Sequence, residues 1–520
     1  MTHWTADEIA PLRLAIRKWD SRDYHMQTGE FYSASNFTVS SGSGWMKIKV
    51  DEQVRDVGRT SAVNVFTECP GLRSSSAKKI HCARDAFGLF ITDSMISSIK
   101  THTEQSGFTT SMPELKAFFA LQFARGFYGR QHSVDLLWSE TFGVNFFNDT
   151  MPRNRFIQIK RYLRFDDKSS RNSRRKLDPF SKIREIFEAL TLNMKTVYKP
   201  HFSLTIDEQL MPSKNRTKLI TYMPNKPDKY GIKFWMVVDN ESKYVYNILP
   251  YLGSYEKETR SGLRLADDTV LRLMQGLLDK GYNVTTDNFF TSPQLARILR
   301  KRRTTIVGTV RANRLHLPAQ LSKETLQLHE SSFYWNNMNK QLVVHYQCKQ
   351  KKAVILLSTL HDNPSVDTSK KQKPNVIRFY NKNKCGVDIV DSMLRKNSTR
   401  CASRKWTVAV WQNMLDIAAL NSWICFKEVR DGQVTHKQFI LLLAKELREE
   451  YICERNIPTA VTLCENKLSH RKRQKCHTSG CTNRSSIICS TCERIFCGPC
   501  CLEAVRKVCT SVCLQCTIKT

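Results

Sequence analysis

Four aspartates in three short segments have the types and the spacing that metal-dependent chemistry needs. Asp207 lies in TIDEQ, Asp287 in TTDNFF, and Asp388 and Asp391 in GVDIVD, each segment ending an apolar strand-like or helix-like stretch. Carboxylate oxygens are the ligands that divalent cations such as Mg²⁺ prefer, and two such cations can drive phosphoryl transfer. The chain has a formal net charge of +33, which suits a phosphate backbone as partner. We therefore expect a metal-dependent enzyme that acts on nucleic acid.

Two strands and one helix are needed to position these acids. Asp207 and Asp287 each follow strand-like text, while the spacing of Asp388 and Asp391 places both on one face of a helix. We expect Asp207, Asp287 and Asp388 to bind Mg²⁺ or Mn²⁺, and Asp391 to be either a ligand or a group that orients the site. Glu208 is excluded because side chains alternate along a strand. Each acid alone is more often a capping or solvated residue, so the order strand, strand, helix carries the argument.

The surrounding sequence predicts a mixed α/β fold. Residues 202–210, 230–239 and 244–253 have the β-branched and aromatic content of three successive strands. Alternating helical and strand-like segments follow to about residue 312, which predicts a mixed sheet covered by helices. Helical periodicity dominates from Ala86 to about residue 200 and resumes near Lys382.

The charge balance indicates a polyanionic partner. Lysine and arginine number 81 against 48 acidic residues, and such an excess favours nucleic acid over a membrane surface. No run of about 18 apolar residues and no secretory signal is visible, so we expect an intracellular protein. Ten basic residues with interleaved aromatics lie between Arg153 and Lys176, and this cluster favours phosphate contact over a solvated helix face. Further phosphate contacts are expected at Lys226, Lys229, Lys233, Arg300, Arg302 and Arg303.

Ten of the 18 cysteines fall in the last 45 residues, which indicates a metal-binding module. Paired thiolates at this spacing are typical of zinc sites, and eight ligands suit two tetrahedral ions. The expected ligands are Cys476, Cys481, Cys489, Cys492, Cys497, Cys500, Cys513 and Cys516, with His477, Cys501 and Cys509 as possible substitutes. In a cross-brace, the first and third pairs would bind one zinc ion and the second and fourth pairs the other. The basic segment at 470–475 is either a nuclear import signal or a DNA contact, and we predict a nuclear location.

The motifs around the aspartates resemble the piggyBac family of DDE/D transposases. The likeness runs in order from about Phe87 to Trp423, through TIDEQLMP, YMPNKPDKYGIKFWMVVD, VTTDNFFTS and NKCGVDIVDSM. It implies an RNase H-like catalytic core and cut-and-paste transposition of DNA, with hairpin ends and insertion at TTAA. Asp207, Asp287 and Asp388 match the catalytic triad, and Asp391 matches a further essential acid. The family also implies a homodimer and recognition of the transposon end by the zinc module.

Trp406 matches a family tryptophan near the active site. It is expected either to stack on a flipped base or to be a core aromatic. The spacer from the GVDIVD helix to Trp406 is shorter here than in the founding family member.

The resemblance and the periodicity together predict a split domain organisation. A poorly ordered region is expected at 1–85, a helical dimerisation and DNA-binding domain at 86–200 and 398–468, and the RNase H-like core at 201–312 and 376–397. An insertion is expected at 313–375 and the zinc-binding domain at 469–520. The alternative to an active transposase is a host-adopted DNA-binding protein that has lost transposition. Retention of all four acids argues against it, because clustered carboxylates repel phosphate.

Overall fold

The computed structural model describes residues 44–50, 65–129, 132–253, 263–430, 432–456, 474–485, 495 and 497. Contacts divide the chain into two compact units. The sheet unit takes its described residues from Met1–Thr109, Gln122–Gln131 and Tyr162–Leu443, and the helical unit from Thr110–Leu121, His132–Arg161 and Ala444–Thr520.

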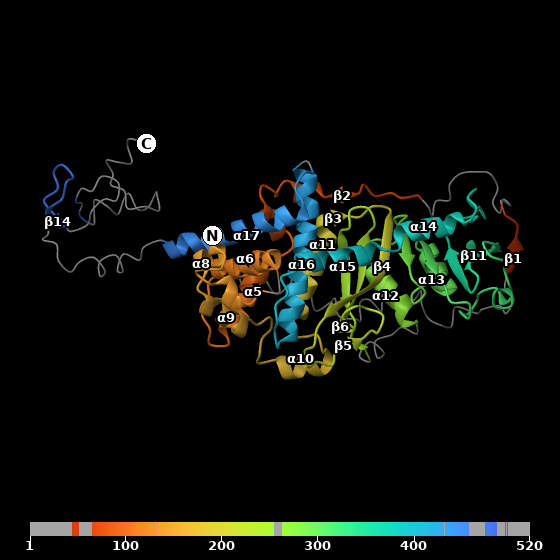
Figure 1. The fold of residues 1–520 in the computed structure, drawn as a ribbon, viewed down its shortest axis with the longest axis horizontal. Coiled ribbons are helices and arrows are strands. Elements are labelled where there is room, and N and C mark those ends of the chain that lie inside the picture. Colours follow the sequence, from red (N-terminus) through yellow and green to blue (C-terminus); the bar gives the residue numbers. More distant parts are fainter. Residues whose placement is uncertain are drawn as a thin grey trace, which may run out of the picture. The chain divides into compact units, whose positions relative to one another are not determined.

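The sheet unit is built on one ten-stranded mixed sheet (Figure 1). The strands are paired in the order β1-β10-β11-β12-β9-β8-β4-β6-β5, and β7 also pairs with β6. The strand bounds are β1 Trp45–Ile48, β4 Ser203–Pro212, β5 Ile220–Tyr222, β6 Tyr230–Asp239, β7 Val245–Pro250, β8 Asn283–Thr286, β9 Thr305–Thr309, β10 Ser331–Asn336, β11 Gln341–Lys349 and β12 Lys352–Ser358. Among the described strand pairs, only β4–β8 and β8–β9 are parallel, and parallel pairs need crossover connections.

Helices of the same unit supply those crossovers and pack on the sheet. α12 (Leu265–Leu273) contacts β6 and β7, α13 (Pro293–Lys301) contacts β9, and α14 (Asn375–Asn383) contacts β4, β9 and β12. α15 (Gly386–Lys396) packs on β4 and β6. The fold is therefore a mixed α/β arrangement in which α14 and α15 lie over the strand that carries Asp207 (Figure 1).

The remaining helices of the sheet unit surround a long buried helix, α16 (Trp406–Val429). Most of its residues are buried, because apolar side chains occur on all its faces and neighbouring helices cover them. α4 (Ala83–Gly88), α11 (Arg184–Val197) and α15 contact α16, and α11 also packs on β7. Other elements are α3 (Ser74–Ala77), α5 (Asp93–Glu104), α10 (Arg171–Leu177), a 3₁₀ turn at Ala319–Ser322 and the short pair β2 (Gly71–Leu72) and β3 (Tyr198–Lys199).

The helical unit contains α7 (Val134–Leu137) and α8 (Asn145–Thr150) whole. It also takes parts of α6 (Met112–Tyr128), α9 (Arg153–Tyr162) and α17 (His436–Asn456). The buried carboxylate of Glu114 accepts two hydrogen bonds from the Arg155 guanidinium, at 2.6 and 2.7 Å. A fork of this kind fixes both distance and orientation, so it sets how α6 and α9 cross inside this unit. A two-stranded hairpin, β13 (Gln474–Lys475) and β14 (Arg484–Ser485), lies farther along the chain.

The structure confirms the strands predicted around the acids, which are β4, β6 and β7, and the alternation of α12, β8, α13 and β9 after them. The described strands of the predicted insertion at 313–375 continue the main sheet, because β12 pairs with β9. In the predicted N-terminal region 1–85, β1 pairs with β10, and residues 1–43 and 51–64 lie outside the described part. Residues 162–200 and 398–443 belong to the sheet unit. Among the described helices, none has the length and apolarity to cross a membrane.

Candidate active site

Asp207 and Asp287 are brought together by the register of two parallel strands. Ile206 on β4 is paired with Thr286 on β8. Asp207 follows Ile206 and Asp287 follows Thr286, and the two strands run in the same direction. Both side chains are half-buried. The sequence places these acids 80 positions apart in the numbering, and only the pairing of β4 with β8 makes them neighbours.

The face of β4 that carries Asp207 is the face that meets α14 and α15. Side chains at alternate positions of a strand share a face, so Thr205, Asp207 and Gln209 point the same way. The Thr205 hydroxyl donates to the carbonyl of Asn383 at 2.5 Å, and the Gln209 amide donates to Asp391 at 3.2 Å. Because both flanking residues contact the α14–α15 segment, Asp207 faces it too.

Asp388 lies in the first turn of α15, and its side chain is 61% exposed. Its nearest cation among the described residues is the Lys226 ammonium, 3.6 Å from the Asp388 carboxylate. The same ammonium donates to the backbone carbonyl of Glu208 at 3.4 Å. The carboxylates of Asp207, Asp287 and Asp388 are not gathered within 4.8 Å of one another in the described part of the chain. Asp388 therefore does not form one compact ligand cluster with Asp207 and Asp287.

Asp391 is held in a different way from the other three acids. Its Oδ1 accepts from Gln209, and its Oδ2 accepts from the Arg395 guanidinium at 2.9 Å. Arg395 also forms an ion pair of 2.6 Å with Asp228. With both oxygens occupied, Asp391 is suited to fixing α15 against β4 rather than to binding a cation directly.

The two strand-borne acids resist ionisation. Burial raises the pKa of Asp207 well above its usual value, and the charges of Glu208 and Asp287 raise it further. Burial likewise raises the pKa of Asp287, with the charge of Glu208 adding to the effect. Glu208 was excluded on strand geometry, yet its charge is close enough to act on both acids. A cation placed between them would relieve this repulsion.

The donor set fits a hard divalent cation. In the ranges that the structure describes, neither Asp207 nor Asp287 forms an ion pair. Asp207 accepts from the Glu208 N–H at 2.8 Å, and Asp287 accepts from the Phe289 N–H at 3.0 Å and from the Phe290 N–H. Each carboxylate therefore has oxygen lone pairs to offer, and carboxylate oxygen is what Mg²⁺ prefers.

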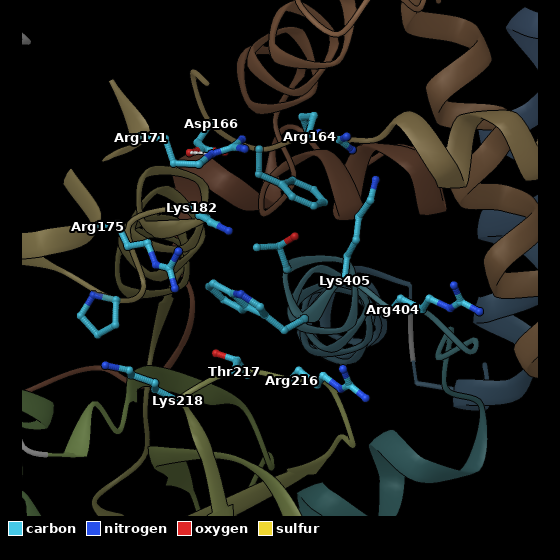
Figure 2. A pocket seen from close by; sticks show the side chains of 14 residues that line it. Arg164, Asp166, Arg171, Arg175, Lys182, Arg216, Thr217, Lys218, Arg404 and Lys405 are labelled. Atoms are coloured by element: carbon cyan, nitrogen blue, oxygen red, sulfur yellow. Dashed lines mark hydrogen bonds and ion pairs between the residues drawn. The ribbon is translucent and has the colours of Figure 1, made fainter. Parts of the chain in front are cut away.

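A basic hollow of about 490 Å³ lies elsewhere in the sheet unit (Figure 2). Its cationic lining residues are Arg164, Arg171, Arg175, Lys182, Arg216, Lys218, Arg404 and Lys405. Figure 2 shows these side chains arranged around the hollow from several separate segments. Asp166, the one acid in the lining, accepts bonds from Arg171 and Arg174, so its charge is already matched inside the protein.

The positive charges that line this hollow outnumber the negative ones, and they lie close enough to repel one another. No hydrogen bond or ion pair within the described residues involves the charged groups of Arg175, Lys182, Arg216, Lys218 or Arg404. Burial lowers the pKa of Lys182, and the charges of Arg171 and Arg175 lower it further. An entering anion would stabilise such a group. The aromatic part of the wall includes Trp406, whose ring packs on Phe180 with centroids 5.7 Å apart.

Comparison with known proteins identifies the family. The family model described as Transposase IS4 matches residues 82–423, well over half of the chain. This chain belongs to the transposase IS4 family and is of the piggyBac type. Its structure is similar to a solved piggyBac transposase, described as a synaptic complex with hairpin DNA, with a TM-score of 0.71 and 28% identity, covering 86% of this chain and 100% of that one.

Human relatives of this transposase-family chain are also piggyBac-derived. It is 21% identical over 311 residues to the human PiggyBac transposable element-derived protein 2 and 22% identical over 375 residues to the human PiggyBac transposable element-derived protein 3. These matches cover 56% and 68% of this chain. They span 52% and 62% of the relatives' own length, so the chain matches about half to three fifths of each.

The other predicted DNA contacts of this transposase-family chain are scattered. Lys229 is exposed on the β5–β6 loop, and Arg303 is exposed after α13. Arg302 forms an ion pair with Asp279 at 2.6 Å. Neither these residues nor Arg300 lines the basic hollow. The hollow therefore contains cations that were not predicted individually from the sequence, among them Lys182, Arg216 and Lys218. The only sequence signal for these three residues is that they lie in basic stretches.

Lys233 has a more specific environment than a surface phosphate contact. Its ammonium lies 4.0 Å from the ring centroids of Trp235 and Tyr251 and 5.9 Å from that of Phe289. Such cation–π contacts hold a charge in place at little desolvation cost. Since Phe289 follows Asp287 by two residues, this cage stabilises the loop that ends β8.

Three of the predicted zinc ligands form a cluster. The sulfur atoms of Cys476, Cys481 and Cys497 all lie within 4.8 Å of one another, and those of Cys481 and Cys497 are 3.5 Å apart. The turn between β13 and β14 brings the first two together. Burial raises the pKa of the Cys476 thiol, but hydrogen bonds from Thr478 and from the Cys497 N–H outweigh it and lower the pKa to about 6. A thiolate is the form that binds metal.

The rest of the predicted zinc ligands lie outside the described residues. They are Cys489, Cys492, Cys500, Cys513 and Cys516, together with the possible substitutes Cys501 and Cys509. The three clustered cysteines are members of the set expected to bind the first ion.

Proposed function

We propose that this chain is a DNA transposase that cuts and joins DNA by metal-dependent phosphoryl transfer, on an RNase H-like core. The observation that carries the proposal is that Asp207 on β4 and Asp287, directly after β8, lie on adjacent parallel strands, with Asp388 on α15, which packs on β4. The similarity to a piggyBac transposase in complex with hairpin DNA supports it. Excision of a transposon and insertion at TTAA follow from the family resemblance.

Asp207, Asp287 and Asp388 would hold the divalent cations, with Mg²⁺ as the expected ion. When bound, such cations supply activation of the attacking oxygen and stabilisation of the leaving oxygen. The remaining side chains position the reactants. Asp391, Gln209 and Arg395 fix the register of α15 on β4, and the excess positive charge of the unit retains the DNA backbone.

The basic hollow suits an unpaired nucleotide of the DNA substrate. A duplex is too wide to enter a volume of about 490 Å³, whereas a single base with its flanking phosphates can do so. Trp406 offers a ring for stacking, and the cations around it offer phosphate contacts. This assigns Trp406 the stacking role that its match to the family tryptophan implies.

The cysteine-rich tail is proposed to bind two zinc ions and to recognise the transposon end. The cluster of Cys476, Cys481 and Cys497 supports the first site. A homodimer that handles two ends together and a nuclear location complete the proposal.

A host-adopted DNA-binding protein without transposition is the second candidate. The observation in its favour is that the human relatives are described as transposable element-derived proteins. It would keep the basic hollow and the cysteine cluster and would not need the buried carboxylate pair.

An excision assay with Asp287→Asn separates the two functions. We expect wild type to release a transposon flanked by its own end sequences in Mg²⁺. The variant should lose at least about 10³-fold in rate, because it removes one of the ligand carboxylates. Asp279→Asn is the matched control, since Asp279 is half exposed and pairs with Arg302 away from the site. Excision by the variant at the rate of the control would refute the catalytic assignment, and DNA binding without excision by wild type would favour the adopted protein.

A further inference from the structure

The loop between β5 and β6 contacts α15, the helix that carries Asp388, at two points. Lys226 lies 3.6 Å from Asp388, and Asp228 lies 2.6 Å from Arg395. The loop has a defined shape, because the Met223 N–H donates to the carbonyl of Lys229 at 2.7 Å and Lys229 adopts a positive φ of 52°. The sequence predicts phosphate contacts for Lys226 and Lys229 of this loop, and the structure adds contacts between the loop and α15.

The two contacts do different things. Arg395 bridges Asp228 and Asp391, while Gln209 occupies the other oxygen of Asp391. This network fixes the backbone of α15 relative to β4 and to the loop. Asp388, one turn earlier, has a single cationic contact among the described residues and a largely exposed side chain. Its carboxylate can therefore change partner without movement of the helix.

Lys226 is positioned between Asp388 and the strand pair. Its ammonium donates to the carbonyl of Glu208, the residue after Asp207. Asp388 is not gathered with Asp207 and Asp287 into one ligand set. A cation that bridges these acids would lie beside the ammonium, and like charges at such distances repel.

We propose that Lys226 is a positioning residue that holds Asp388 as its counter-ion and gives up that carboxylate when a divalent cation binds. The inference rests on the proposed metal site. Binding then consists of an exchange in which Asp388 leaves the ammonium and the released Lys226 side chain is free to contact a DNA phosphate. The Asp228–Arg395–Asp391 network keeps α15 in place during the exchange.

Metal binding without DNA tests this exchange in the full-length chain. Lys226→Met keeps the length of the side chain and removes its charge. Lys229→Met is the matched control, because it makes the same change at an exposed position of the same loop. The melting temperature in EDTA and in Mg²⁺, and the Mg²⁺ affinity by calorimetry, are measured for both variants and for wild type.

We expect Lys226→Met to melt below Lys229→Met in EDTA, since the acids lose their resident positive charge. Mg²⁺ should close that gap, and the Mg²⁺ affinity of Lys226→Met should rise by about three- to tenfold, the effect of one partly exposed charge. Equal melting temperatures in EDTA, or an affinity no higher than that of the control, would overturn the role of Lys226. If Mg²⁺ binds to none of the three proteins, the proposed metal site itself fails.

Discussion

The strand-borne carboxylates are held where a proton and a divalent cation compete for the same oxygens. Burial and the neighbouring charges of Glu208 and Asp287 raise the pKa of Asp207, so the folded protein takes up protons there more readily than the unfolded chain. The site is therefore least stable when it is ionised and has no cation. This is a local cost that the rest of the fold must support.

The contribution of Asp207 and Asp287 to the stability of the metal-free protein should fall as pH rises above about 4, the usual range of a carboxyl group. A raised pKa in the folded state means that the native protein binds more protons than the unfolded chain, so the free energy of unfolding falls with rising pH. Asp207→Asn removes one of these groups. Urea unfolding in EDTA should show this variant gaining on wild type between pH 5 and pH 7. A difference between this variant and wild type that stays constant with pH would contradict the prediction.

At the scale of helices and strands, the first residue of α15 sets how closely this helix approaches β4. Gly386 begins α15, and a Cβ there would lie 2.5 Å from Asn240 and 3.1 Å from Thr205. Only a glycine allows the helix to start so close to β4. The network of Asp391, Arg395 and Asp228 then holds the next turn.

Arg395→Met distinguishes the two roles open to Asp391. If Asp391 positions α15 through Arg395, this variant should lose excision activity to nearly the extent of Asp391→Asn, by about 10- to 100-fold, as for groups that orient metal ligands. Lys396→Met, at an exposed position of the same helix, should keep full activity. If instead Arg395→Met behaves like Lys396→Met while Asp391→Asn is inactive, Asp391 acts directly as a ligand.

For the molecule as a whole, part of the excess positive charge lines the basic hollow, where separate chain segments meet. The basic hollow takes its cations from 164–182, 216–218 and 404–405. Such a site contributes to affinity for any sequence, in proportion to the phosphates that it contacts.

Removing two of these cations should flatten the salt dependence of DNA binding. For a duplex with an unpaired base, Lys182→Gln with Lys218→Gln should reduce the slope of log affinity against log salt by about 2, one unit for each lost phosphate contact. The double change Lys323→Gln with Lys349→Gln, at exposed positions outside the hollow, is the control. A fully paired duplex should be affected less than the bulged one. An equal effect on both DNAs would argue against a nucleotide in the hollow.

Local sequence patterns predicted the helices and strands better than they predicted the side-chain contacts of the candidate site. The β-branched text of β4 and the helical spacing of Asp388 and Asp391 were sufficient to predict the strand and the helix. The hydrogen bond from Gln209 to Asp391 could not be predicted, because Gln209 lies far from α15 in sequence. The cage around Lys233 depends on Tyr251 and Phe289 in the same way. Side-chain partners from distant segments are set by the tertiary fold, which periodicity does not encode.

The sheet runs without interruption from β4, β8 and β9 into the residues predicted as an insertion, since Leu356 to Ser358 of β12 pair with Val307 to Thr309 of β9. Removal of residues 313–375 would therefore leave the backbone groups along one side of β9 without partners. A bare strand edge of this kind invites pairing with another chain and aggregation. A shortened version of this chain would have to retain β12 or cover β9 with a substitute strand.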